Sequence, residues 1–262
     1  MNFKSKIIVL LLVLNCSIAN AQFVKKHGQL SVKGTQLVDK NRNPIVLRGV
    51  SLGWHSIWPR FYNEKVVDWL KKDFNCNIVR AAMGIEIGAH PYMKEPQFSK
   101  EKIEVVIKGA IKSDIYVIVD WHSHNINLKE AKEYFDEISK KYGKYPNVIY
   151  EIFNEPDYET WPEVKSYSEE IIKVIRANDP YNVILVGCPK WDQDVNLPAA
   201  DPIKGYDNLC TPCIFMQQPI KKNLGTEPMK RSKVVCQFLS PNQQGWKLQE
   251  TDRWIMLPGR NT

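Results

Sequence analysis

The sequence predicts an α/β fold, a (β/α)8 TIM barrel of which about five strand–helix units are recognisable, with an irregular C-terminal tail. Short β-branched apolar segments suit strands that are buried on both faces. Segments with helical spacing of apolar residues separate them. Polar and aromatic residues directly follow the strands, as at the C-terminal face of a barrel. No glycine-rich phosphate loop follows the first strand, which argues against a nucleotide-binding doubly wound sheet.

Residues 1–21 have the pattern of an export signal. Lys4 and Lys6 precede an apolar run at residues 7–14, and the triplet Ala-Asn-Ala at 19–21 offers a small-residue cleavage site. The apolar run is too short to span a membrane. Cys16 leaves a lipoprotein as a weaker alternative. The mature chain is therefore expected to work outside the cytoplasm, secreted or periplasmic, and not in a membrane.

The remaining elements follow in order along residues 22–208. A small hairpin is expected over residues 28–47, with its turn at 39–44. Strands are expected at residues 46–50, 77–83, 115–120, 148–153 and 182–187. Helices are expected at residues 63–74, 99–112, 128–141 and 162–176. Asn63 can cap the first helix, whose spacing turns Val66, Val67, Trp69 and Leu70 towards a core.

The charge distribution excludes a nucleic-acid partner. The net charge is +7, but the excess of cations lies in the export signal and in the tail from residue 209 to 262. Residues 22–208 are neutral overall, so no basic stripe is available to follow a phosphate backbone.

Polar or aromatic residues lie at the end of each predicted strand. Placing such residues there costs free energy, which suggests that they serve a function. If the strands are parallel, all of these residues meet at one opening. Tryptophans there suit sugar rings, whose apolar faces stack on aromatic surfaces while their hydroxyls need hydrogen-bond partners. The residues concerned are Trp54, His55, Trp58, Arg80, Asp120, His122, His124, Asn154, Glu155 and Trp191.

The segment that ends in Asn154, Glu155 and Pro156 is the most informative. Pro156 cannot donate to a strand ladder, so the strand should stop there and leave Glu155 at its C-terminal mouth. A carboxylic acid among apolar neighbours has its charged form disfavoured and can donate a proton near neutral pH. Arg80 can order a carboxylate by bidentate donation, although a structural ion pair is the simpler interpretation of an isolated arginine.

A rival interpretation follows from His122 and His124. A His-x-His directly after a barrel strand is typical of metal-dependent hydrolases, in which both imidazoles bind zinc. Such a site needs further ligands on later strands, and of the other histidines only His55 follows a strand. A metal site is therefore not expected.

Four segments in order resemble glycoside hydrolase family 5, and within it the bacterial endo-β-1,4-glucanase branch: IVLRGVS (45–51), NIVR (77–80), VDWH (119–122) and NVIYEIFNEP (147–156). The resemblance covers about residues 27–208. It implies a (β/α)8 barrel that hydrolyses β-glucan by a retaining mechanism with two glutamates and without a cofactor or metal, and a monomer is expected.

The resemblance also implies roles for individual residues. Glu155 would be the general acid/base, and Asn154 would bind the sugar 2-hydroxyl. Arg80 would support the nucleophile, and the catalytic group would include His122. The substrate-binding residues would be His55, Trp58, His124 and Trp191.

Residues 209–262 lack the family's second glutamate in a recognisable context. Glu227 and Glu250 are its carboxylate candidates, but both lie in turn-rich surroundings, and we assign neither. Reverse translation of residues 210–221, read one base earlier, can give MYTLHFYAATHK, which resembles the family's sixth strand. The same shift over residues 229–242 can give DEALKSGLPIFVSE, which ends in a glutamate. We therefore expect a frameshifted tail and little or no hydrolysis by the chain as written; a non-catalytic glucan-binding protein is the alternative.

Overall fold

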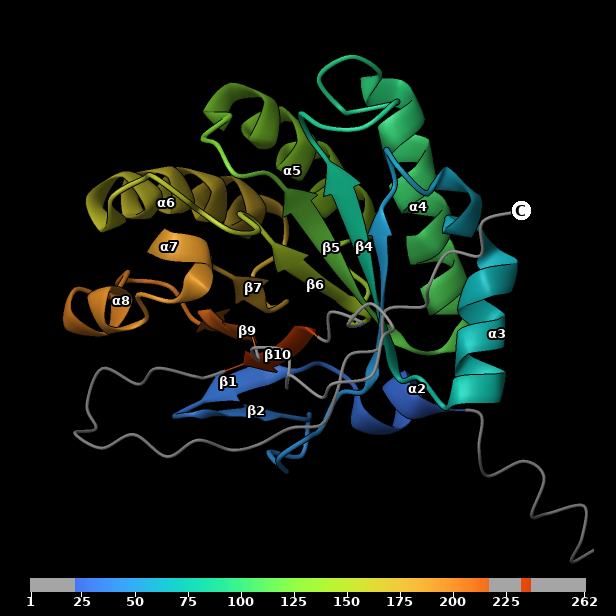
Figure 1. The fold of residues 1–262 in the computed structure, drawn as a ribbon. Coiled ribbons are helices and arrows are strands. Elements are labelled where there is room, and N and C mark those ends of the chain that lie inside the picture. The colour runs from blue at the N-terminus through green and yellow to red at the C-terminus, as the bar shows by residue number, and fades with distance from the viewer. Residues whose placement is uncertain (1–21, 217–231, 237–262) are drawn as a thin grey trace, which may run out of the picture.

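The structure is a computed structural model that describes residues 22–216 and 232–236. Its centre is a six-stranded sheet in the order β3-β4-β5-β6-β7-β8, in which every neighbouring pair is parallel (Figure 1). The strands are β3 (Gly49–Trp54), β4 (Ile78–Gly84), β5 (Tyr116–His122), β6 (Val148–Glu151), β7 (Ile184–Leu185) and β8 (Leu209–Cys210).

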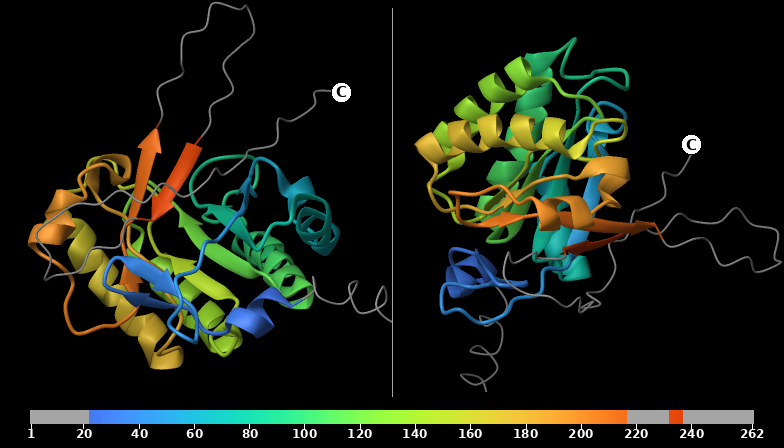
Figure 2. Two further views of the ribbon diagram at one scale, coloured as in Figure 1. Left: turned by 90° about the horizontal axis from the view of Figure 1, so that it is seen from below. Right: turned by 90° about the vertical axis from the view of Figure 1, so that its left-hand side faces the viewer.

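Helices connect these strands and cover one face of the sheet. The covering helices are α3 (Glu64–Phe74), α4 (Pro96–Ser113), α5 (Leu128–Tyr142) and α6 (Trp161–Asn178). The left view in Figure 2 shows them side by side along that face. The shorter elements are η1 (Pro59–Phe61), α7 (Pro189–Asp192), α8 (Asn196–Ala200), β9 (Pro212–Met216) and β10 (Ser232–Cys236). None of the helices within residues 22–216 has the length and apolar character needed to cross a bilayer.

The N-terminal segment lies across the end of the sheet where its strands begin (Figures 1 and 2). It contains α2 (Phe23–His27), β1 (Ser31–Lys33) and β2 (Gln36–Val38). The Tyr116 hydroxyl donates to the Gly28 carbonyl at 2.7 Å. The amide of Val32 donates to the Asn208 side chain at 3.0 Å. These contacts close the lower end of the sheet.

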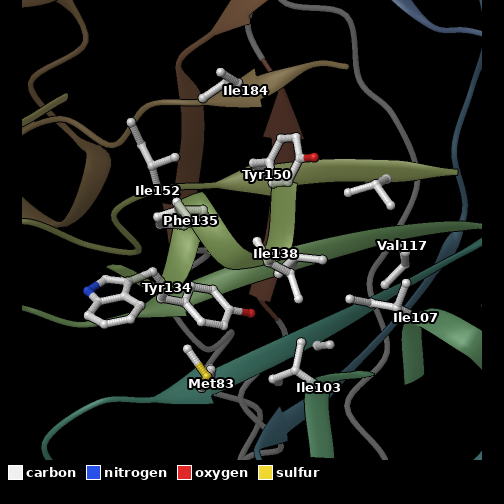
Figure 3. Packing of buried hydrophobic residues seen from close by; sticks show 14 of the residues in the cluster. Met83, Ile103, Ile107, Val117, Tyr134, Phe135, Ile138, Tyr150, Ile152 and Ile184 are labelled. Atoms are coloured by element: carbon white, nitrogen blue, oxygen red, sulfur yellow. The ribbon is translucent and has the colours of Figure 1, made fainter. Parts of the chain in front are cut away.

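Two layers of side chains make up the core. The larger cluster fills the space between the sheet and its helices, with Met83, Val117, Tyr150 and Ile184 facing Ile103, Ile107, Tyr134, Phe135 and Ile138 (Figure 3). The second cluster lies on the opposite face, where Ile78, Ile118 and Ile149 pack with Val24 and Leu30 of the N-terminal segment. The isoleucines form an apolar floor on this inner face of the sheet. Because side chains alternate along a strand, the residues two positions further along each strand lie on the same face, above that floor.

Most predicted elements form at nearly the predicted residues, but the first strand differs. It was expected at residues 46–50, with a loop from Ser51, and it instead runs from Gly49 to Trp54. The preceding residues are held by the hairpin, since the Ile45 amide donates to Leu37 and Pro44 bridges Val38. The turn at residues 39–44 forms, but the hairpin of β1 and β2 turns earlier, at Gly34.

Two further expectations are corrected by the structure. Trp69 does not enter the core: α3 buries Val67 and Leu70, while Trp69 is 42% exposed and packs on Phe74 with 4.8 Å between ring centroids. The sheet also contains β8 at residues 209–210, which adds a sixth parallel strand to the five that were expected. The N-cap at Asn63 is confirmed, since its side chain accepts a hydrogen bond from the Val66 amide at 3.0 Å.

Gly49 permits a close approach of β3 to β4, and its replacement tests that register. A Cβ at Gly49 would lie 1.7 Å from the Ile78 carbonyl oxygen, so the two backbones would have to separate. We expect Gly49→Ala to lower the free energy of unfolding by about 3 kcal/mol, measured by urea denaturation. Val46→Ala, at a nearby position that is 44% exposed, is the control and should change it by less than about 0.5 kcal/mol. Equal effects of the two variants would contradict the observed register.

Candidate functional site

Three charged side chains occupy the inner face of the sheet, one level above its apolar floor. Arg80 on β4, Asp120 on β5 and Glu151 on β6 each follow by two residues an apolar residue of that floor. Strand pairing places Asp120 directly beside Glu151. The parallel register therefore brings one cation and two carboxylates together at the C-terminal end of the sheet.

Arg80 joins these groups through a dense set of contacts. Its Nε donates to Glu151 Oε2 at 2.7 Å, and its Nη2 donates to Glu151 Oε1 at 3.0 Å. The same Nη2 lies 2.8 Å from Asp120 Oδ2 and 2.6 Å from Asn154 Oδ1. Burial alone would lower the pKa of Arg80, but Asp120 and Glu151 together raise it. The guanidinium is thus a fixed cation that holds three neighbours in place.

Asp120 is shared between Arg80 and His122. Burial raises the pKa of Asp120 to about 7, against the opposing effect of Arg80. His122 has a pKa well below its usual value because of burial and then of Arg80, so its ring is neutral. Since the Arg80 guanidinium 2.8 Å from Asp120 Oδ2 favours the ionised carboxylate, we assign the proton to His122 Nδ1, which lies 2.7 Å from that oxygen. This leaves His122 Nε2 as an acceptor.

Asn154 and Glu155 follow β6 at the mouth of the sheet. Arg80 fixes the orientation of the Asn154 amide, because Oδ1 accepts from the guanidinium and Nδ2 must then point elsewhere. This Nδ2 is buried and has no hydrogen-bond partner among the described residues. Glu155 is partly exposed, and its backbone carbonyl accepts from His124 Nδ1 at 3.0 Å. A fixed amide donor therefore stands next to an accessible carboxyl group.

Aromatic rings line the same region. Trp54, at the end of β3, lies 4.7 Å from the His122 ring centroid and 6.4 Å from that of His124. Trp58 is partly buried against β3, where a Cβ at Gly53 would lie 2.6 Å from its ring. Trp191 is 43% exposed at the other side of the site, on the turn after β7. Trp54 is one of the strand-end residues of the sequence, but the resemblance implies no substrate-binding role for it.

His55 does not reach the surface of the site. Its side chain is fully buried, with Nε2 donating to Ser99 Oγ at 2.9 Å and Nδ1 accepting from the Gly84 amide at 3.1 Å. Burial lowers the pKa of His55 to about 4, which keeps the ring neutral. His55 therefore supports the backbone at the end of β4, and a direct contact with a substrate is not available to it in this structure.

The histidine pair does not assemble a metal centre in the part of the chain that the structure describes. The His122 and His124 rings lie 6.1 Å apart, and each Nδ1 is engaged, by Asp120 and by the Glu155 carbonyl. Among residues 22–216 no three histidine, cysteine or acidic side chains are grouped so that they could hold an ion.

Sequence reasoning missed two carboxyl groups that shape the site. Glu151 is 3% exposed and forms an ion pair with Arg80. Asp192 lies in the turn that follows β7 and is fully buried. Burial raises the pKa of Glu151, and it raises that of Asp192 well above the usual value. The strand period could have revealed Glu151, since it lies two residues after inward-facing Ile149. Nothing in the sequence pattern marks Asp192.

Comparisons with known proteins identify the relatives of this chain. A scan of protein families matches residues 38–213 to Cellulase (glycosyl hydrolase family 5). The chain is 40% identical over 204 residues to Endoglucanase of Clostridium saccharobutylicum, an alignment that covers 75% of this chain and 45% of that protein. It is 45% identical over 180 residues to Endoglucanase Z of Dickeya dadantii, covering 66% and 42% respectively. The chain thus spans less than half the length of these curated relatives.

Solved structures give the same result. A structure from Cytophaga hutchinsonii matches with a TM-score of 0.70 at 42% identity, covering 72% of this chain and 62% of the other. The catalytic domain of endoglucanase Cel5A from Thermobifida fusca matches with a TM-score of 0.67 at 34% identity, covering 72% and 65%. With the parallel sheet and its helices, these matches confirm the predicted α/β barrel class.

Proposed function

The chain belongs to glycosyl hydrolase family 5, the cellulase family, and from that membership we propose that its site is the acid/base half of an endo-β-1,4-glucanase. Its substrate would be a β-glucan polysaccharide. The catalytic domain of Thermobifida fusca Cel5A, which is 34% identical, has been solved in complex with cellotetraose. That ligand is therefore the first probe for this chain.

One observation carries the proposal: Arg80 fixes Asn154 beside Glu155. The Asn154 Nδ2 is a buried donor without a partner among the described residues, and a sugar hydroxyl would satisfy it. A sugar bound in this way would bring its glycosidic oxygen close to the carboxyl group of Glu155. Trp54 and Trp191 provide aromatic surfaces on which pyranose rings stack.

The proposed reaction is retaining hydrolysis. Glu155 protonates the leaving oxygen while a second carboxylate attacks the anomeric carbon, and Glu155 then removes a proton from the water that releases the sugar. The second carboxylate is not assigned here. Glu227 and Glu250, the candidates from the sequence, lie outside the described residues.

We further propose that residues 209–262 are translated from a shifted reading frame. Supporting this, the match to the family ends at residue 213, shortly after the expected frameshift. Nucleotide sequencing around the codon of Leu209 is the test. An inserted or deleted base is expected there, and an intact frame with unrelated codons downstream would refute the proposal.

We also propose that residues 1–21 are an export signal and that the protein acts as a monomer outside the cytoplasm. The signal residues lie outside the described part of the chain. Their pattern and the relatedness to bacterial endoglucanases support this placement. N-terminal sequencing of the exported protein would be expected to begin at Gln22.

Binding of cellotetraose by the chain as written tests the glucan site without requiring turnover. We expect binding by isothermal titration calorimetry, weakened about tenfold by Asn154→Ala because a buried hydrogen bond is lost. Glu170→Gln, on the outer helix α6, is the control and should bind normally. Absence of binding by the unaltered chain would refute the proposal. Binding without any release of reducing sugar would favour the alternative of a non-catalytic glucan-binding protein.

A further inference from the structure

The turn that carries Trp191 has an unusual backbone. Lys190, Trp191 and Asp192 all have left-handed φ values, of 56°, 54° and 61°. This conformation is unfavourable for residues with a Cβ, and three in succession persist only where the surroundings determine them. The structure must therefore contain contacts that hold this turn.

Asp192 supplies those contacts from inside the turn. Its side chain is fully buried, and Oδ1 accepts a hydrogen bond from the Cys188 amide at 2.6 Å. Its own amide donates to the Cys188 carbonyl at 3.1 Å, so the turn is closed from both directions. A carboxyl group is costly to bury, and an apolar side chain of similar size would fill the space without that cost. What the carboxyl group adds is the acceptor for Cys188.

The turn is also tied to the segment that carries Glu155. The Trp191 amide donates to the Pro156 carbonyl at 2.9 Å. Gly187 allows this approach, because a Cβ there would lie 2.9 Å from Pro156 Cδ and 3.2 Å from Asp192 Oδ1. The exposed indole of Trp191 and the backbone beside Glu155 therefore share one support.

We propose that Asp192 is a positioning residue that locks residues 188–192, so that Trp191 is held as a sugar platform and Pro156 is held beside Glu155. Asp192 touches no substrate itself and acts through Trp191. The role of Asp192 in sugar binding rests on the proposed glucan-binding function. The locking of the turn does not depend on any ligand. The two parts can therefore be tested separately.

Binding of cellotetraose to the full chain tests the role. We expect Asp192→Ala to weaken binding about tenfold, since the Cys188 amide loses its acceptor and the turn relaxes. Asp192→Asn should bind within about twofold of the unaltered chain, because the amide oxygen still accepts and asparagine tolerates left-handed φ. Trp191→Ala should also weaken binding, and the Asp192→Ala/Trp191→Ala double variant should bind no more weakly than Trp191→Ala alone. Additive losses, or normal binding by Asp192→Ala, would overturn the proposal.

Amide hydrogen exchange without ligand tests the lock. Exchange at the Trp191 amide should speed up at least about tenfold in Asp192→Ala and stay unchanged in Asp192→Asn. Amides of α5 should be unaffected in both variants. Asp192→Gly is the second variant should Asp192→Ala fail to fold, because glycine adopts left-handed φ freely yet lacks the acceptor. If the unaltered chain binds no cellotetraose, the proposed function fails, and unchanged exchange at Trp191 in the alanine and glycine variants would refute the lock itself.

Discussion

Replacing Glu155 by glutamine is expected to slow the hydrolysis of cellotetraose by about 10²–10⁴-fold in the chain with its reading frame restored. Glutamine cannot protonate the leaving oxygen, although it keeps the shape of the side chain. The restored frame is used because the chain as written is expected to release little or no reducing sugar. Reducing-sugar assays on the two proteins, prepared in parallel, measure the effect.

The choice of leaving group separates a general acid from a residue that only binds. An activated aryl β-cellobioside needs little protonation, so bond cleavage should suffer much less in Glu155→Gln than it does with cellotetraose. Azide should then accelerate turnover by replacing the water that Glu155 no longer activates. Glu170→Gln on α6, whose side chain is 44% exposed, is the matched control and should leave both rates unchanged. Equal losses on the two substrates would remove Glu155 from the acid/base role.

Removing the charge of Arg80 should destabilise the fold more than any surface substitution. Arg80→Met leaves Asp120 and Glu151 buried without their cation, and we expect the free energy of unfolding at pH 8 to fall by about 3–5 kcal/mol. The loss should be smaller at pH 5. Burial already raises the pKa of both carboxyl groups, and without Arg80 they take up protons more readily and become neutral as the pH falls. Urea denaturation at the two pH values measures this.

Two variants make the Arg80 experiment specific. Lys108→Met removes a lysine whose side chain is 55% exposed and which pairs with Glu104 on α4. Because Glu104 keeps its second partner, Lys141, this variant should cost less than about 0.5 kcal/mol at either pH. Adding Glu151→Gln to Arg80→Met removes one of the stranded charges and should recover part of the stability at pH 8. A loss that does not depend on pH would show that the methionine acts through packing and not through the buried charges.

Much of the fold could be predicted because its central units have strong periodicity. β4, β5 and the helices that follow them lie within a few residues of their predicted positions, since apolar strands and amphipathic helices differ clearly in spacing. The first strand could not be placed, because the apolar residues 45–47 suit a strand equally well but are held by the hairpin before it. Trp69 was misplaced because helical spacing does not distinguish a buried position from one at the edge of the core.

The position of the candidate site residues was predictable where they lie on strands or directly after them. Arg80, Asn154, Glu155, His122 and His124 lie together at one end of the sheet, as parallel strands require. His55 also follows a strand, but the short turn after Trp54 directs it into the interior, which spacing alone does not reveal. Asp192 could not be identified from the sequence, because residues 190–192 include no glycine that would indicate a left-handed backbone.

The segment beneath the sheet has a consequence for how the protein acquires its structure during synthesis. Residues 22–33, the first of the described part to leave the ribosome, are held by Asp114, Tyr116 and Asn208, which emerge much later. Contacts between residues so distant in sequence form slowly, because a long loop must close before any of them contributes. Residues 22–33 therefore stay undocked until those later segments have been synthesised, a period in which their apolar side chains are available to chaperones.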